Sequence, residues 1–336
     1  MTGDSIPKLP RFDRLLKQVS RSFYLSIRVL PRQVRPQIGL TYILARTADT
    51  VADTRSVPIE LRFAALLRIR EAIIAAAAGN AVQPPDLNGL SRWMAQTERA
   101  LLESFPDALD MLRQCSAADR RHIGDALVSI TGGQEMDVAR FGDATVENIA
   151  ALDTDEELDD YTYRVAGCVG EFWTKMCRAH LFPEATVADA SLLENGVRFG
   201  KGLQLVNILR DLPGDLRQGR CYIPRAPLAE RNLSPQSLLD PSTMDRFRSL
   251  YDRYLRQAEK YLVAGQAYTH ALPRSQFRVR LACTLPMLLG TETLARLRTG
   301  NVLDDRYTIK VSRSEVRRLI LAALLDCLRP RAGPVC

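Results

Sequence analysis

The chain has 336 residues, of which 46% are hydrophobic and 25% are charged, and its formal net charge is +7. A chain of this length buries a large core, and its basic residues are spread along it rather than clustered, which argues against a nucleic-acid partner. Seven cysteines without a C-x-x-C pair and only three histidines argue against a disulfide framework, a zinc ribbon and a histidine-based metal site.

No stretch of the sequence predicts a membrane anchor. The first residues lack the apolar core of a secretory signal. The longest apolar run near the end, residues 319–325, is far shorter than the roughly 20 residues of a membrane span. We therefore expect a cytoplasmic monomer that at most associates with the membrane surface. The excess of arginine favours an anionic small substrate or an acidic membrane surface as its partner.

The first helical segment, residues 13–30, contains the string S-R-S-F-Y. The guanidinium of Arg21 and the hydroxyl of Ser22 suit the oxygens of a phosphate group. Ser20 is equally consistent with the N-cap of a helix, so the string by itself leaves both interpretations open.

A second helix follows after two prolines, and polar residues interrupt its apolar surface on one side. At about 100° per residue these side chains lie on one face of the helix. They are Tyr42, Arg46, Asp49 and Asp53. A buried carboxylate is costly unless a cation compensates it, so this face is a candidate site.

Helical periodicity continues through the middle of the chain. Residues 60–78 form a strongly amphipathic pattern, and the period resumes over residues 91–114 and 117–139. In the last of these segments, Gln134 and Asp137 could face a cleft. The acidic patch that follows these segments begins another helix, because acidic residues suit a helix N-terminus.

The helix that begins with residues 153–160 continues through Tyr161 and Tyr163. An aromatic lining would suit a carbocation, although an aromatic stripe on a helix is more often part of the core. Small residues follow, and they would allow a neighbouring helix or a ligand to approach closely. They are Ala166, Gly167 and Gly170.

The segment from Gly200 to Pro224 predicts a helix that is apolar nearly all round and therefore buried. Its polar residues fall within roughly 80° of one another. They are Gln204, Asn207, Asp211 and Asp215. Pro213 lacks an N–H and disfavours helix at the residue before it, so we expect Asp215 to lie beyond the helix end. Long helices over residues 243–271 and 275–298 complete an all-α fold.

The chain thus carries two D-x-x-x-D pairs about half its length apart. Four carboxylates facing one another across a cleft would repel, and a divalent cation is the usual compensation. Mg²⁺ fits best, because it binds one or two carboxylates per ion and completes its shell with water and phosphate oxygens. A solvated acidic helix face is the alternative for either pair alone. Both pairs lie in apolar helices beside arginine and amide residues, which favours the metal site.

Four stretches together resemble the squalene/phytoene synthase family, the head-to-head prenyl synthases. They are SRSFY, ARTADTVAD, YTYRVAGCVG and QLVNILRDLPGDLRQGRCYIP, in the order of the family. The resemblance spans residues 15–320. It implies an all-α isoprenoid synthase fold in one domain, residues 1–336, with a central cavity between the two aspartate-bearing helices. The ends, residues 1–12 and 329–336, would be flexible.

The resemblance also implies an activity. Two farnesyl diphosphates would condense in the presence of Mg²⁺ through a cyclopropyl intermediate, presqualene diphosphate. The implied catalytic residues are Asp49, Asp53, Asp211, Asp215, Tyr161 and Tyr163, and the implied metal ligands are the same aspartates with Asn207. The implied substrate-binding residues are Arg21, Ser22, Tyr42, Arg46, Gln204, Asn207, Arg210 and Arg220.

The last part of the chain resembles squalene synthases of bacterial type, which reduce the intermediate with NADPH. Lys310 matches a lysine of their cofactor site, while Ser312 stands where they carry arginine. The implied cofactor-binding residues are Arg21, Arg46, Lys310 and Arg313. Animal enzymes have a tyrosine where this chain has Arg164. Its own tyrosines are Tyr161 and Tyr163, and this pattern is closer to that of phytoene synthases. The alternatives are a phytoene, dehydrosqualene or hydroxysqualene synthase without the reduction, and a non-catalytic member of the fold.

Overall fold

The computed structural model confirms the all-helical fold class. It describes residues 10–19, 23–185, 188–304, 311–312, 314–316 and 318–321, the side chains of residues 10–13 and 23–25 excepted. Four residues singled out in the sequence lie outside the described part. They are Arg21, Ser22, Lys310 and Arg313.

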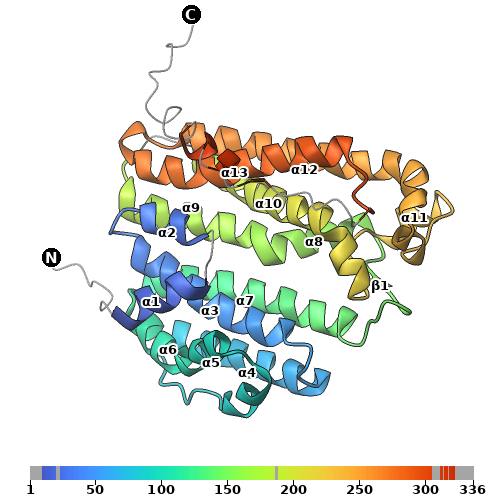
Figure 1. The fold of residues 1–336 in the computed structure, drawn as a ribbon. Coiled ribbons are helices and arrows are strands. Elements are labelled where there is room, and N and C mark those ends of the chain that lie inside the picture. Colours follow the sequence, from blue (N-terminus) through green and yellow to red (C-terminus); the bar gives the residue numbers. More distant parts are fainter. Residues whose placement is uncertain are drawn as a thin grey trace, which may run out of the picture.

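Long helices make up most of the described chain (Figure 1). The α-helices are α1 (Pro10–Val19), α2 (Phe23–Val29), α3 (Arg35–Asp53), α4 (Ile59–Ala77), α5 (Gln96–Glu103), α6 (Phe105–Gln114), α7 (Ala117–Phe141), α8 (Asp155–Thr162), α9 (Cys168–Leu181), α10 (Asp189–Arg217), α11 (Arg225–Ala229), α12 (Met244–Ala271) and α13 (Phe277–Thr299). Short 3₁₀ turns lie at Asn88–Trp93, Gln236–Leu239, Pro241–Thr243 and Arg274–Gln276, and a π-helical turn at Tyr163–Gly167 joins α8 to α9. Residues 10–12, which we expected to be flexible, belong to α1, whose Leu15 and Leu16 are buried.

The helices form two packed groups. In one group α3 contacts α4, α6 and α7, and α4 contacts both α6 and α7. In the other group α10 contacts α9, α12 and α13. The groups meet where α7 contacts α9 and the π-helical turn. Figure 1 shows this order from α4 at the bottom to α12 and α13 at the top. The two helices that carry the aspartate pairs, α3 and α10, therefore lie in different groups.

Glycines let α10 lie directly against the backbone of α9 and the π-helical turn. A Cβ atom on Gly170 would stand 2.0 Å from the carbonyl oxygen of Gly196, and one on Gly200 would stand 2.2 Å from that of Ala166. No side chain fits at such distances. The close approach that the small residues predict is thus confirmed, and it involves a neighbouring helix.

The sequence prediction that α10 ends near Pro213 is wrong. The helix continues to Arg217, so Asp211 and Asp215 both lie within it. A proline in a helix leaves the carbonyl four residues earlier without its N–H donor. Here that carbonyl belongs to Leu209, and the hydroxyl of Tyr251 on α12 donates to it at 3.0 Å. The tertiary contact replaces the lost helical hydrogen bond.

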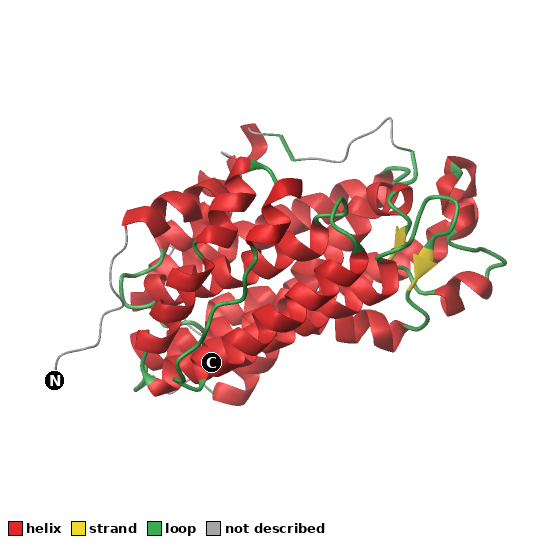
Figure 2. Cartoon of the chain, turned by 90° about the horizontal axis from the view of Figure 1, so that it is seen from below, coloured by secondary structure: helices red, strands yellow, loops and turns green. Residues whose placement is uncertain are grey.

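A two-residue parallel ladder, which the sequence pattern does not predict, ends this region. Strand β1 (Ala150–Ala151) pairs with β2 (Arg220–Cys221), at one end of the bundle (Figure 2). Gly219 precedes β2 with φ +79°, and a Cβ atom there would stand 2.5 Å from the Thr145 nitrogen. Only glycine allows this turn, which directs the chain after α10 back toward α3 and α7.

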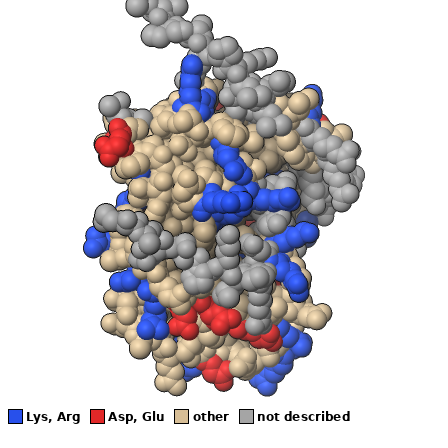
Figure 3. Space-filling model, turned by 90° about the vertical axis from the view of Figure 1, so that its left-hand side faces the viewer, with Lys and Arg blue, Asp and Glu red and all other residues tan. Residues whose placement is uncertain are grey.

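The surface agrees with the spread of charge along the sequence. On the face in Figure 3, lysine and arginine side chains lie in several separate groups among uncharged residues. Among the described residues, no helix has both the length and the apolar character needed to cross a membrane.

The glycine contact between α9 and α10 predicts the effect of one methyl group. Gly170→Ala should lower the free energy of unfolding by about 1–3 kcal/mol, because the new atom would overlap backbone that cannot rotate away. Denaturant unfolding followed by circular dichroism would measure it. The matched control is Gly214→Ala on α10, where nothing lies within 4 Å and the helix should gain up to about 1 kcal/mol. Equal effects of both substitutions would contradict the packing argument.

Candidate active site

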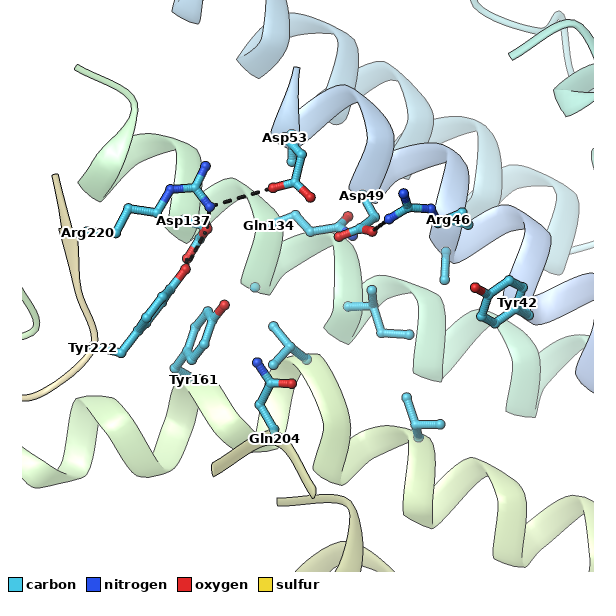
Figure 4. A pocket seen from close by; sticks show the side chains of 16 residues that line it. Tyr42, Arg46, Asp49, Asp53, Gln134, Asp137, Tyr161, Gln204, Arg220 and Tyr222 are labelled. Atoms are coloured by element: carbon cyan, nitrogen blue, oxygen red, sulfur yellow. Dashed lines mark hydrogen bonds and ion pairs between the residues drawn. The ribbon is translucent and has the colours of Figure 1, made fainter. Parts of the chain in front are cut away.

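A polar cavity of about 380 Å³ lies between the two groups of helices (Figure 4). Residues of α3, α7, α8, the π-helical turn, α9, α10, β2 and the residue that follows β2 line it. The polar ones are Tyr42, Arg46, Asp49, Asp53, Gln134, Asp137, Tyr161, Gln204, Arg220 and Tyr222. The whole predicted polar face of α3 thus lines this cavity.

The first aspartate pair meets one arginine from its own helix and one from far along the chain. Asp49 forms an ion pair with Arg46, and the Nη1 atom of Arg220 lies 3.6 Å from the Oδ1 atom of Asp53. Burial and the nearby charge of Asp53 raise the pKa of Asp49 to about 6, although Arg46 opposes them; Asp137 adds to the increase. The carboxylates are therefore crowded enough to repel.

Arg220 links the carboxylate of Asp53 on α3 to that of Asp137 on α7. Its side chain is 12% exposed, and Nη1 lies 3.4 Å from Asp137, whose carboxylate accepts hydrogen bonds of 2.9 and 3.0 Å from the hydroxyl of Tyr222. Burial raises the pKa of Asp137 to about 6, even though Arg220 and the Tyr222 hydroxyl favour its ionised form. The ring of Tyr161 stacks on that of Tyr222 with centroids 4.8 Å apart.

The second aspartate pair lies on α10 and is not among the residues that line this cavity. Asp211 is exposed and forms two hydrogen bonds with Arg210, of 2.8 and 2.6 Å. Asp215 is half-buried, and its pKa is raised to about 7 by burial and by the charge of Asp211, against the effect of Arg220. Asp137 and Asp53 also raise the pKa of Asp215, so the two pairs act on each other electrostatically.

The two predicted tyrosines lie in different places. Tyr161 lines the polar cavity, whereas the hydroxyl of Tyr163 donates to Glu171 at 3.0 Å and lines a separate acidic surface cavity. Two positions along a helix correspond to a rotation of about 200° about its axis, so such residues point to nearly opposite sides. Of the two predicted catalytic tyrosines, the structure brings only Tyr161 to the aspartates.

A second cavity of about 550 Å³ adjoins the polar one and is mainly apolar. Both cavities share part of their lining, namely Tyr42, Asp49, Val165, Val169 and Gln204. Its other lining residues are Ala166, Gly170, Trp173, Gly196, Phe199, Gly200, Leu203, Asn207, Tyr268, Ala282, Cys283 and Pro286. A charged end and an apolar extension therefore form one continuous binding region.

The donor set fits a hydrated divalent cation rather than a preformed metal centre. Within the described residues, no three His, Cys, Asp or Glu side chains converge closely enough for such a centre. Mg²⁺ needs only one or two carboxylates per ion, and Asp49 and Asp53 line the same cavity as Gln134. The Oε1 atom of Gln134 is buried and accepts no hydrogen bond from any described residue. An acceptor of this kind beside carboxylates suits a cation or its bound water.

Sequence reasoning pointed to part of this site and missed part. Gln134 and Asp137 were placed near a cleft but not assigned to the site, although two polar residues three apart on an apolar helix form one face. Tyr222 was not singled out, and its only sequence signal was its position two residues after Arg220, in the segment that follows α10. Gln134, Asp137 and Tyr222 all line the polar cavity, although Tyr222 lies more than 80 positions after the other two in the sequence.

Comparisons with known proteins agree with this geometry. A model of the squalene/phytoene synthase family matches residues 16–315. The phytoene synthase of Cereibacter sphaeroides is 26% identical over 338 residues, which cover 96% of this chain and 81% of that protein. The bifunctional lycopene cyclase/phytoene synthase of Phaeosphaeria nodorum is 27% identical over 318 residues. That match covers 91% of this chain, which spans only about half, 48%, of the bifunctional protein.

A solved structure shares the fold. TcSQS in complex with the ligand E5700 superposes with a TM-score of 0.74 at 21% identity, over 97% of this chain and 92% of its own. The architecture is thus the isoprenoid synthase fold that the sequence resemblance implied. Since the family model covers most of the sequence, the chain belongs to the squalene/phytoene synthase family, whose members join two prenyl diphosphates head-to-head.

Proposed function

We propose that this protein joins two molecules of a prenyl diphosphate head-to-head with Mg²⁺ and releases an unreduced hydrocarbon of the phytoene or dehydrosqualene type. One observation carries the proposal: a cavity lined by Asp49, Asp53 and Arg220 opens into an apolar cavity through shared lining residues. The polar part would bind diphosphate groups, and the apolar part would hold a prenyl chain away from water.

Each part of the site has a task in this reaction. Arg46 and Arg220 supply the fixed positive charge that a departing diphosphate needs. Asp49, Asp53 and Asp215, with Asp211 and Asn207, would hold Mg²⁺. When bound, Mg²⁺ stabilises the negative charge that develops on the leaving group. Loss of diphosphate leaves an allylic cation, which the double bond of the second substrate attacks to form a new carbocation. Loss of a proton from that carbocation then closes the ring of a cyclopropyl diphosphate.

The fate of that intermediate separates the members of the family. The names of the relatives reported above favour phytoene synthases, which end the reaction by proton loss. Reduction by NADPH to squalene is the second candidate. It is supported by the sequence match at Lys310, which lies outside the described residues together with Arg313.

Product analysis tests the proposal. The purified protein with Mg²⁺ should convert farnesyl or geranylgeranyl diphosphate into a hydrocarbon of the same mass with and without NADPH, because proton loss needs no hydride donor. Mass spectrometry would identify the product and the preferred chain length. A product that becomes two hydrogens heavier only with NADPH would support squalene instead. An alcohol would indicate capture by water, and a folded protein without any product would contradict an enzymatic function.

The continuous path of α10 changes what is expected of the second aspartate pair. Asp215→Asn should lower kcat on the order of 100-fold, as Asp49→Asn should, because each removes a carboxylate that would hold the Mg²⁺ needed to stabilise the departing diphosphate. Steady-state kinetics with the preferred diphosphate would measure both. Asp107→Asn, on the exposed face of α6, is the control. Near-normal turnover of Asp215→Asn would show that Asp215 takes no part in binding Mg²⁺ or substrate.

The crowded carboxylates also predict a pH-dependent stability. The pKa of Asp215, about 7, and that of Asp137, about 6, lie above their ordinary value of 3.8. Between these values the folded protein binds more protons than the unfolded chain, so without Mg²⁺ the free energy of unfolding should fall as pH rises from 3.8 to about 7.

Unfolding measured at several pH values would show this decline, and added Mg²⁺ should reduce it by binding only the folded, ionised form. Asp215→Asn should flatten the metal-free profile, whereas Asp107→Asn should not. A stability that increases over this pH range in the metal-free protein would contradict the carboxylate crowding.

A further inference from the structure

Gln134 is a buried polar group of the site whose role the geometry above leaves unexplained. It is 7% exposed, it lines the polar cavity, and its Oε1 atom has no hydrogen-bond donor among the described residues. A buried acceptor without a donor costs free energy, so native proteins rarely keep one unless water or an ion satisfies it.

The described surroundings of Gln134 provide no hydrogen-bond donor to its Oε1 atom. It lies one turn before Asp137 on the same face of α7, and Figure 4 shows it extending toward Asp49 on α3. In Figure 4 the carboxylate of Asp49 lies beside the end of this side chain, and carboxylate oxygens are also acceptors. Arg46, the cation that pairs with Asp49, makes no hydrogen bond with Gln134.

The substrate cannot satisfy this atom either. The oxygens of a fully ionised diphosphate are acceptors, and a prenyl chain has neither a donor nor a charge. A metal ion, or a water molecule bound to that ion, can satisfy an amide oxygen that lies beside carboxylates. Mg²⁺ accepts carboxylate and amide oxygens together in its coordination shell.

We infer that Gln134 provides a further oxygen for the divalent cation at Asp49 and Asp53, either as a direct ligand or through a metal-bound water. The inference rests on the metal requirement of the proposed function. It extends the cation site from the two aspartate helices, α3 and α10, to a third helix, α7.

Metal binding without turnover tests this role. Mn²⁺ with inorganic pyrophosphate serves as the probe, and electron paramagnetic resonance measures the free ion. Gln134→Met keeps a similar shape but removes the oxygen, so the Kd for Mn²⁺ should rise about 10- to 100-fold. Gln134→Leu should give the same result, and Gln134→Glu should bind Mn²⁺ as well as the wild type or better.

Ile130→Val, one turn earlier on the same face of α7 and in the same cavity, is the matched control and should leave the Kd unchanged. Thermal unfolding without metal should show Gln134→Met at least as stable as the wild type, because an unsatisfied acceptor has been removed.

Equal Mn²⁺ affinity of the wild type and Gln134→Met would overturn the inference alone and leave the proposed function intact. A metal-free Gln134→Met protein that is less stable, with unchanged Mn²⁺ affinity, would make Gln134 a structural residue. A wild type that binds no Mn²⁺ in the presence of pyrophosphate would overturn both this inference and the metal requirement of the proposed function.

Discussion

Electrostatic repulsion among carboxylates is the constraint on which the site depends. Asp49, Asp137 and Asp215 all have raised pKa values, each because burial and a neighbouring carboxylate disfavour ionisation. Arg220 is the shared cation, and it pairs with Asp53 and Asp137 from the strand after α10. In the polar cavity, Arg46 and Arg220 supply two positive charges against the carboxylates of Asp49, Asp53 and Asp137. The folded protein therefore holds a negatively charged cavity that further positive charge would stabilise, which is the physical basis for proposing divalent cations there.

The rest of the fold holds this cluster in place. Helix α10 can approach α9 because Gly170 and Gly196 bring their backbones into contact. The helix keeps Asp215 within reach of Arg220 because it continues past Pro213. There the hydroxyl of Tyr251 donates to the Leu209 carbonyl in place of the missing proline N–H. Gly219 then turns the chain so that Arg220 and Tyr222 enter the cavity. Each of these features is local, yet each is needed to place charges from separate helices together.

The binding region consists of a polar cavity and an adjoining apolar cavity. The charged cavity lies between α3, α7 and the segment after α10, and the apolar cavity extends from it along α9 and α10. Tyr42, Asp49 and Gln204 belong to both. Such an arrangement suits a substrate with a charged head and a long hydrocarbon tail, because each end is matched by its surroundings. In the proposed reaction, the apolar cavity would also shield a reactive cation from water, which is a condition for forming hydrocarbon rather than alcohol.

The sequence by itself determined the fold class, the family and the composition of the α3 face. These follow from helical periodicity and from motifs, and both are local: residues three or four apart on one helix share a face whatever surrounds them. Asp49 and Asp53 could thus be placed beside Arg46 and Tyr42 without a structure.

Only the tertiary structure decided the remaining geometry, because it depends on contacts between residues far apart in the chain. Local rules predicted that Pro213 ends the helix, and a hydroxyl from α12 overrides them. They could not choose between Tyr161 and Tyr163, since the choice depends on which side of the helix faces α7. They also could not show that Tyr222 and Asp137, 85 positions apart, meet beside Arg220. Periodicity fixes which side chains share a face, but the packing of that face against other helices decides which of them form the site.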